Sequence, residues 1–319
     1  DLIQENVIIL ENRISLALNQ KARNWLSSSS AIILNWVDGA ILTLLFPFRK
    51  KIAAMFWGGD LTFLLKGAES KNPIKKMVST CIKKQVESLP CTITLSRGEY
   101  DLLRSACSLK GKWLLGSFMS NSMKEIQKKC STRDAYDETR ILLGNSATSS
   151  NRHQQMFDML ERFNKENAVF YAPLTYGDME YRDKIIKLGK DKFGDKFVPL
   201  VKHMDSSDYL DFLSTITVGV FNHNRQQGIG NISRLLAFGA KVYLSKDGPL
   251  LEENLKDGFK VFPTEDIPNQ SFEELIFMKD KDRETNTQKA SFEAYSQEAK
   301  ELWSKIIAYL NVVKPYERS

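Results

Sequence analysis

The chain contains few of the residues from which proteins build disulfides and metal sites. It has four cysteines and three histidines in 319 residues. They are Cys81, Cys91, Cys107, Cys130, His153, His203 and His223. No cysteines have CxxC spacing, and no histidines have HxH or HExxH spacing. These absences argue against a disulfide framework and a zinc site. We therefore expect free thiols, a reducing compartment and no metal held by the protein.

Long apolar runs are also missing. The longest, residues 31–48, is interrupted by Asn35 and Asp38 and is followed by the basic residues 49–51. It falls short of the ~20 apolar residues that a membrane-spanning helix needs. No segment has the pattern of a signal peptide, and no internal repeat is visible. We expect a cytoplasmic protein in which residues 31–48 are either core or in contact with a membrane surface.

The excess of positive charge lies in the first part of the chain. The net charge is +6. Residues 1–140 carry 21 Lys and Arg against 13 Asp and Glu, whereas residues 141–319 carry 24 against 26. A one-sided basic surface favours an anionic partner such as a membrane or a lipid phosphate, although it also occurs as a plain solvated surface. The basic segments lack interleaved aromatic residues, which argues against nucleic acid as the partner.

From residue 140 onward, apolar β-favouring runs alternate with helical patterns, as in right-handed βαβ units of a parallel sheet. The expected strands are residues 140–143, 168–173, 197–201, 218–221 and 239–244. The polar residues 130–139 ahead of them are interpreted as an interdomain linker. We predict a basic first domain at 1–138, which faces an anionic partner or a membrane, and a second domain at 139–290. A closing helix at 291–319 is expected to pack back across both.

The first domain shows the same alternation less clearly. We expect strands at 31–37 and 91–95, helices at 40–54 and 74–86, and a short apolar strand end at 55–57, whereas residues 110–129 are basic and mixed in character. Two carboxylates follow these strands. Asp60 comes after Gly58 and Gly59, and Glu99 opens the helix after the strand at 91–95. A carboxylate at the carboxyl end of a parallel strand is well placed for a ligand, although a lone Asp after two glycines is more often a turn residue or a helix cap.

A strand, a glycine loop and a helix follow one another from residue 218. Gly228 and Gly230 let a ligand approach the main chain, and Asn231 is the expected N-cap of the helix. The positive end of that helix and the forked donor of Arg225 suit a phosphate. On these residues alone, an ordinary connection with an exposed arginine is the simpler interpretation. A second loop with Gly144, Asn145 and Ser146 ends another strand of the same expected sheet, which favours a shared diphosphate site.

These segments resemble, in order, the enterobacterial N-acetylfucosaminyltransferases of glycosyltransferase family 56. The matching segments are residues 56–61, 96–99, 141–146, 150–153, 173–177, 208–210 and 225–230. The resemblance implies an α/β GT-B fold with two Rossmann-like parallel-sheet domains facing a cleft. A first strand should precede residue 31 in such an enzyme, so we expect the N-terminal domain to be incomplete.

The resemblance also implies an activity, in which residues 1–138 form the acceptor side and residues 139–290 the side that binds the nucleotide-sugar donor. It implies a metal-independent transferase that moves a deoxy-amino sugar, as in dTDP-N-acetylfucosamine, to a lipid-linked or polysaccharide acceptor at the inner face of the cell membrane. Asp60 is the first candidate base for the acceptor hydroxyl and Glu99 the second, followed by His223 and His153. Tyr176 either flanks the nucleobase or is structural. The expected donor-binding residues are Gly144, Asn145, Ser146, Tyr176, Asn222, Arg225, Gln226, Gln227, Gly228, Ile229, Gly230 and Asn231.

The helix after the glycine loop departs from the common pattern. Many GT-B enzymes carry an acidic residue there, where this chain has Arg234 and Leu235. Two alternatives therefore stay open. One is a nucleotide-sugar epimerase of the same fold, which would convert its sugar without an acceptor. The other is a catalytically silent binding protein with a degenerate donor pocket.

Overall fold

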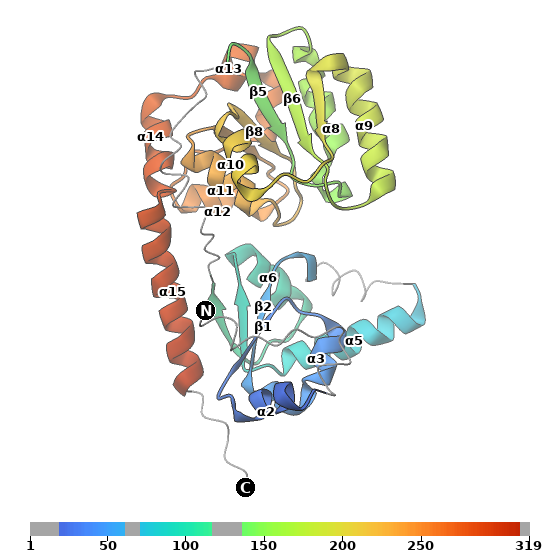
Figure 1. Ribbon diagram of the computed structural model, residues 1–319, viewed down its shortest axis with the longest axis vertical. Coiled ribbons are helices and arrows are strands. Elements are labelled where there is room, and N and C mark those ends of the chain that lie inside the picture. The colour runs from blue at the N-terminus through green and yellow to red at the C-terminus, as the bar shows by residue number, and fades with distance from the viewer. Residues whose placement is uncertain (1–18, 61–70, 117–135, 313–319) are drawn as a thin grey trace. The chain divides into compact units, whose positions relative to one another are not determined.

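The computed structural model describes residues 19–60, 71–116 and 136–312 (Figure 1). The chain divides into two compact units. The first comprises Asp1–Phe118 and Ala299–Ser319, and the second comprises Met119–Glu298. Each unit is built on its own parallel β-sheet.

The first unit contains a four-stranded sheet in the sequential order β1-β2-β3-β4. Its strands are β1 (Ile32–Asn35), β2 (Ile52–Phe56), β3 (Cys91–Thr94) and β4 (Lys112–Leu115). The helical segments between and before them are α2 (Gln20–Ser28), α3 (Gly39–Leu44), η1 (Phe46–Lys51), α5 (Pro73–Glu87) and α6 (Arg97–Ala106). A parallel sheet in sequential order places its right-handed crossovers on one face.

Side chains of β2 alternate between two cores. Ile52, Ala54 and Phe56 pack with the crossover helices. Ala53 and Met55 point to the opposite face, where side chains of α15 (Phe292–Val312) cover the sheet. The sheet is therefore buried on both faces, as parallel sheets require.

One prediction for the first unit is wrong. The helix expected at residues 40–54 ends at Leu44 and gives way to the short 3-10 segment η1, and residues from Ile52 onward form strand β2. All five residues of β2 are buried, and such an unbroken apolar run cannot be told from a buried helix by periodicity. Strand β4 lies in the basic, mixed segment from 110, to which we assigned no helix or strand from the sequence.

The second unit contains a six-stranded parallel sheet in the order β10-β9-β8-β5-β6-β7. Its strands are β5 (Thr139–Leu143), β6 (Ala168–Pro173), β7 (Phe197–Leu200), β8 (Val218–Phe221), β9 (Lys241–Leu244) and β10 (Phe262–Pro263). The strand order reverses between β5 and β8, which is the doubly wound arrangement of dinucleotide-binding folds.

Helices cover both faces of this sheet (Figure 1). The bounds are η3 (Ser149–Asn151), α8 (His153–Leu160), η4 (Glu161–Phe163), α9 (Met179–Phe193), η5 (Gly194–Lys196), α10 (Ser206–Ser214), α11 (Ile229–Ala237), α12 (Pro249–Lys256), η6 (Thr264–Asn269), α13 (Phe272–Ile276) and α14 (Asp280–Lys289). Side chains of α8 and α9 pack against one face, and those of α10, α11 and α12 against the other.

The boundaries of the units differ in detail from those expected from the sequence. Most of the linker predicted at 130–139 lies outside the described residues, and Thr139 already belongs to β5. The closing helix is α15, and its residues from Ala299 onward are grouped with the first unit. None of the helices described is both long and apolar enough to cross a membrane.

Candidate active site

The two loops expected to bind the donor follow neighbouring strands at the reversal point of the second sheet. Strands β5 and β8 pair in parallel, with Leu143 opposite Val220. The amide of Gly144 continues this ladder by donating to the Val220 carbonyl at 2.9 Å. Both loops therefore leave the sheet at its carboxyl edge, where open α/β sheets bind ligands.

Gly228 opens the helix that follows the second loop. It adopts a left-handed backbone (φ 70°) and is the N-cap of α11. Asn231 was expected to be that cap, and this prediction is wrong. Asn231 lies in the first turn of α11, and its side-chain amide donates to the Tyr209 hydroxyl at 2.9 Å. Glycine has no side chain to cap the helix, so the positive dipole end of α11 faces the loop without a side-chain cap.

A chain of side-chain hydrogen bonds joins the two loops. The Tyr176 hydroxyl accepts from the Asn145 amide at 3.0 Å, and the Asn145 oxygen accepts from the Gln227 amide at 2.8 Å. The Gln227 oxygen accepts from the Ser150 hydroxyl at 2.5 Å, and Ser150 accepts from Arg225 Nε at 3.2 Å. Four of the predicted donor residues are thus brought together, with Tyr176 57% exposed at one end.

The side chain of Asn151 supports both loops through hydrogen bonds in the protein interior. Its side chain is fully buried. Its Oδ1 accepts from the backbone N–H of Asn145 at 3.0 Å and lies 2.8 Å from His223 Nε2. Its Nδ2 donates to the Ser146 carbonyl at 2.8 Å and to the Thr148 hydroxyl at 3.0 Å. Because Oδ1 can only accept, His223 donates through Nε2, and this single amide links the β5 loop to the end of β8.

Two buried imidazoles lie directly beneath the loop glycines. A Cβ on Gly144 would sit 3.1 Å from His153 Nε2 and 2.6 Å from Asn151 Oδ1, and a Cβ on Gly228 would sit 3.0 Å from His223 Cε1. Burial lowers the pKa of His153 to about 4. Burial, together with the neighbouring His153 and Arg225, lowers the pKa of His223 to about 3. Both rings are neutral near pH 7 and act as packing and hydrogen-bonding groups.

Two further predicted donor residues are buried. The Asn222 amide donates to Gln155 Oε1 at 2.8 Å, and its oxygen accepts from the Thr264 hydroxyl at 2.9 Å. Gln226 is 4% exposed. Both side chains are thus enclosed beneath the loop, and their donor-binding roles stay predictions.

The candidate bases lie at the carboxyl edge of the first sheet. Both oxygens of Asp60 accept backbone N–H groups, from Val37 and from Trp57, each at 2.9 Å. Glu99 is 1% exposed, lies in the first turn of α6 and accepts from the Leu95 amide at 3.3 Å. Both carboxylates therefore position backbone, and a catalytic role for either stays a prediction. Within 19–60, 71–116 and 136–312, no three His, Cys, Asp or Glu gather into a metal-binding group.

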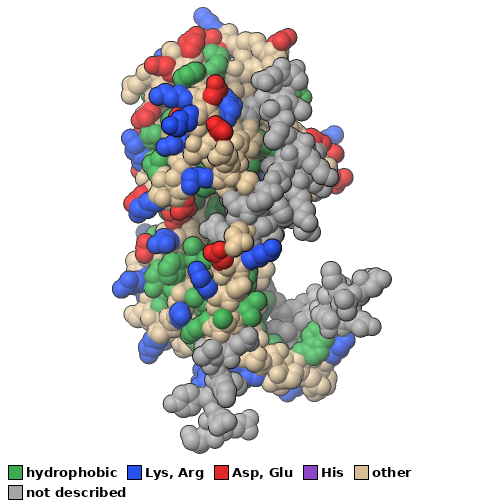
Figure 2. Space-filling view, turned by 90° about the vertical axis from the view of Figure 1, so that its left-hand side faces the viewer, with side chains coloured by type: hydrophobic (Ala, Val, Ile, Leu, Met, Phe, Trp, Pro, Cys, Tyr) green, Lys and Arg blue, Asp and Glu red, His purple; other side chains and the backbone are tan. Residues whose placement is uncertain are grey.

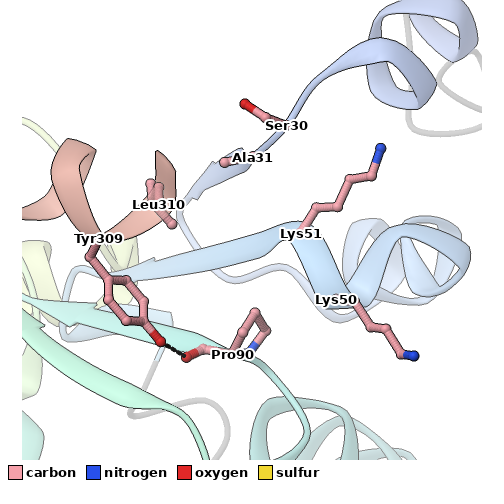
Figure 3. A pocket seen from close by; sticks show the side chains of 7 residues that line it. All are labelled: Ser30, Ala31, Lys50, Lys51, Pro90, Tyr309 and Leu310. Carbon is pink, nitrogen blue, oxygen red and sulfur yellow. Dashed lines mark hydrogen bonds between the residues drawn. The ribbon is translucent and has the colours of Figure 1, made fainter. Parts of the chain in front are cut away.

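A small hollow lies at the amino edge of the first sheet (Figure 3). Residues from the starts of β1, β2 and β3 and from α15 line it. Tyr309 donates to the Pro90 carbonyl at 3.2 Å, and Lys51 Nζ donates to the carbonyls of Ser27 and Ser29. The polar groups of Tyr309 and Lys51 are thus engaged in hydrogen bonds to backbone carbonyls. The hollow lies at the opposite edge of the sheet from Asp60.

Three site residues had no role assigned from the sequence. Ser150, Asn151 and Gln155 join the loops or support Asn222. The sequence did show a run of hydroxyl and amide side chains at the start of the helix that follows the β5 loop. This pattern did not reveal which of these side chains form buried hydrogen bonds between the loops, because such bonds involve residues more than 60 positions away.

Solved structures of similar fold are trehalose-6-phosphate synthases. The "OtsA apo structure" superposes with a TM-score of 0.65 at 12% identity, covering 93% of this chain and 76% of the other. An alpha,alpha-trehalose 6-phosphate synthase from Burkholderia multivorans has a TM-score of 0.65 at 10% identity, with 94% and 76% covered. The structure described as trehalose-6-phosphate from E. coli bound with UDP-2-fluoro glucose has a TM-score of 0.65 at 11% identity, with 93% and 77% covered.

At these identities the likeness defines the fold, and it confirms the GT-B class expected from the sequence: two parallel-sheet α/β units. The family follows from a separate match. The model of the family described as 4-alpha-L-fucosyltransferase, glycosyl transferase group 56, matches residues 91–310, more than half of the chain. The chain belongs to this family and is a glycosyltransferase, which confirms the resemblance.

Proposed function

We propose that the protein transfers a deoxy-amino sugar of the N-acetylfucosamine type from a dTDP-linked donor to a lipid-linked or polysaccharide acceptor, without a metal ion. The observation that carries the proposal is the pair of loops at the reversal point of the second sheet, in a chain of the 4-alpha-L-fucosyltransferase family. The nucleotide-sugar donor and sugar acceptor follow from the family, and the particular sugars are our proposal.

The chemistry asks for stabilisation of a diphosphate leaving group. Negative charge grows on that group as the bond to the anomeric carbon breaks. The first-turn amides of α11 and the Arg225 guanidinium supply fixed positive charge beside Gly228, which gives backbone close access. The acceptor hydroxyl must lose a proton to a base, for which Asp60 and Glu99 remain the candidates.

A nucleotide panel tests the donor site. We expect dTDP or a dTDP-sugar to raise the thermal midpoint of the wild-type protein more than UDP or GDP does, because a ligand that binds only the folded state stabilises it. Arg225→Ala should remove the shift. Arg182→Ala, on α9 and paired with Asp183, is the matched control and should keep it. A panel in which no nucleotide shifts the midpoint would refute the donor site.

Turnover separates the remaining alternatives. Sugar conversion without any acceptor would identify an epimerase. Donor binding without turnover in the presence of lipid-linked and glycan acceptors would indicate a silent binding protein.

We further propose that the first unit docks on an anionic membrane surface through helix α5. Ile74, Met77 and Val78 are exposed there at 67, 62 and 45%, next to the exposed Lys75 and Lys76. Apolar side chains beside lysines are typical of helices that lie in the membrane interface. Figure 2 shows the side of the molecule that carries α15, where Lys and Arg side chains are spread over the surface of the first unit.

Liposome flotation tests this docking. The wild-type protein should float with vesicles containing phosphatidylglycerol at low salt and lose binding as salt rises, since each cation near the surface contributes about 1 kcal/mol. Lys75→Glu with Lys76→Glu should abolish flotation. The pair Lys184→Glu with Lys187→Glu, exposed on α9 of the second unit, should not. Equal flotation of both double variants would contradict a role for α5.

A further inference from the structure

Trp36 has a backbone conformation that tryptophan rarely adopts. It follows strand β1 with φ 84°, in the left-handed region, and its side chain is 48% exposed. A bulky residue in this region costs about 1–3 kcal/mol, and such positions gather at functional sites. Because the indole is only about half buried, its burial offsets this cost only in part.

Three neighbouring contacts determine where the indole lies. The Trp36 amide donates to the Met55 carbonyl at 3.1 Å. The Asp60 carboxylate accepts from Val37 on one side and from Trp57 on the other, so it ties the end of β1 to the end of β2. A Cβ on Gly59 would lie 2.8 Å from Trp36 Cη2, so the ring rests directly over this glycine.

The location suits a sugar. Strands β1, β2 and β3 are parallel neighbours, so Trp36 shares the carboxyl edge of the sheet with Asp60 and Glu99. An aromatic face carries partial negative charge and attracts the weakly positive C–H groups of an apolar ring face. A pyranose presents such a face together with hydroxyl groups, and ligand sites combine aromatic surface with a few polar groups.

We propose that Trp36 is a stacking platform for a pyranose ring of the acceptor, with Asp60 and Gly59 as the positioning residues that hold it. The assignment rests on the proposed function, because it places the acceptor on the first unit. Stacking on the indole would align the sugar while leaving its hydroxyl edge free for the reaction.

Saturation-transfer NMR with methyl N-acetyl-β-glucosaminide as the pyranose probe tests the platform directly. The wild-type protein should transfer magnetisation mainly to one C–H face of the ring. In Trp36→Ala the signal should fall at least about fivefold, the loss expected for one aromatic contact. Trp25→Ala, on α2 at the amino side of β1, is the matched tryptophan control and should keep the signal.

Two further variants separate binding from stability. Trp36→Gly relieves the backbone strain and should be at least as stable as Trp36→Ala, yet lose the signal. Gly59→Ala should reduce the signal by displacing the Trp36 ring. This variant tests the proposal if Trp36→Ala fails to fold. No signal with the wild-type protein, or equal signals in the wild type and Trp36→Ala, would overturn the proposal. The dTDP thermal shift should persist in all these variants, and its absence from the wild-type protein would instead refute the proposed function.

Discussion

Replacing Asn151 with alanine is expected to weaken dTDP binding at least about tenfold and to lower the free energy of unfolding by about 3–5 kcal/mol. The amide is fully buried and joins Asn145, Ser146 and His223. Its removal leaves the Asn145 N–H and the His223 Nε2 without their partner in a place that water does not reach. The β5 loop keeps its bonds to Val220 and Gln227 but loses the contact between Asn151 and His223, so the spacing of the two donor loops is less firmly fixed.

A matched variant separates the two effects. Asn286 is also fully buried, and it bonds the amide and the carbonyl of Lys260 at 2.7 and 2.9 Å. Asn286→Ala should cost similar stability but leave the dTDP dissociation constant unchanged in calorimetry below the unfolding range. If both variants bind dTDP like the wild-type protein, Asn151 has no part in positioning the donor loops.

The doubly wound unit was predictable because its strands are buried on both faces and separated by clear helical patterns. The strands at 168–173 and 218–221 match β6 and β8. Placing both loops at one sheet edge followed from parallel connectivity alone. In the first unit, the apolar run of β2 carried no period of its own. The helix predicted at 40–54 therefore wrongly included the first residues of β2.

Side-chain roles were less predictable than backbone positions. Gln227 contacts Asn145 and Arg225 contacts Ser150, because these residues lie on or beside two loops at the same sheet edge. Their roles in donor binding stay predictions. Asn222 and Asp60 were chosen for their chemistry, yet both bond protein groups. Whether a polar side chain faces a ligand or the protein depends on contacts far away in the chain. The sequence pattern around a single residue does not contain that information.

Mild acid is expected to destabilise the protein through its two buried imidazoles. The folded pKa values, about 4 for His153 and about 3 for His223, lie below the ordinary value of 6.5. As pH falls below 6.5, the unfolded chain takes up protons that the folded chain refuses, so stability decreases. The loss grows until the pH reaches the folded pKa values. Between pH 7.5 and 5, each ring should cost about 2 kcal/mol, and urea unfolding at the two pH values measures the sum of about 4 kcal/mol.

Single substitutions assign this acid sensitivity to a residue. His223→Gln cannot titrate, and its side-chain amide can replace Nε2 as donor to Asn151. It should therefore remove about half of the pH-dependent loss while preserving the dTDP thermal shift. A wild-type protein equally stable at pH 7.5 and 5 would show that His153 and His223 take up protons in the folded state as readily as in the unfolded chain. In that case the region next to the loop glycines Gly144 and Gly228 would be accessible to solvent.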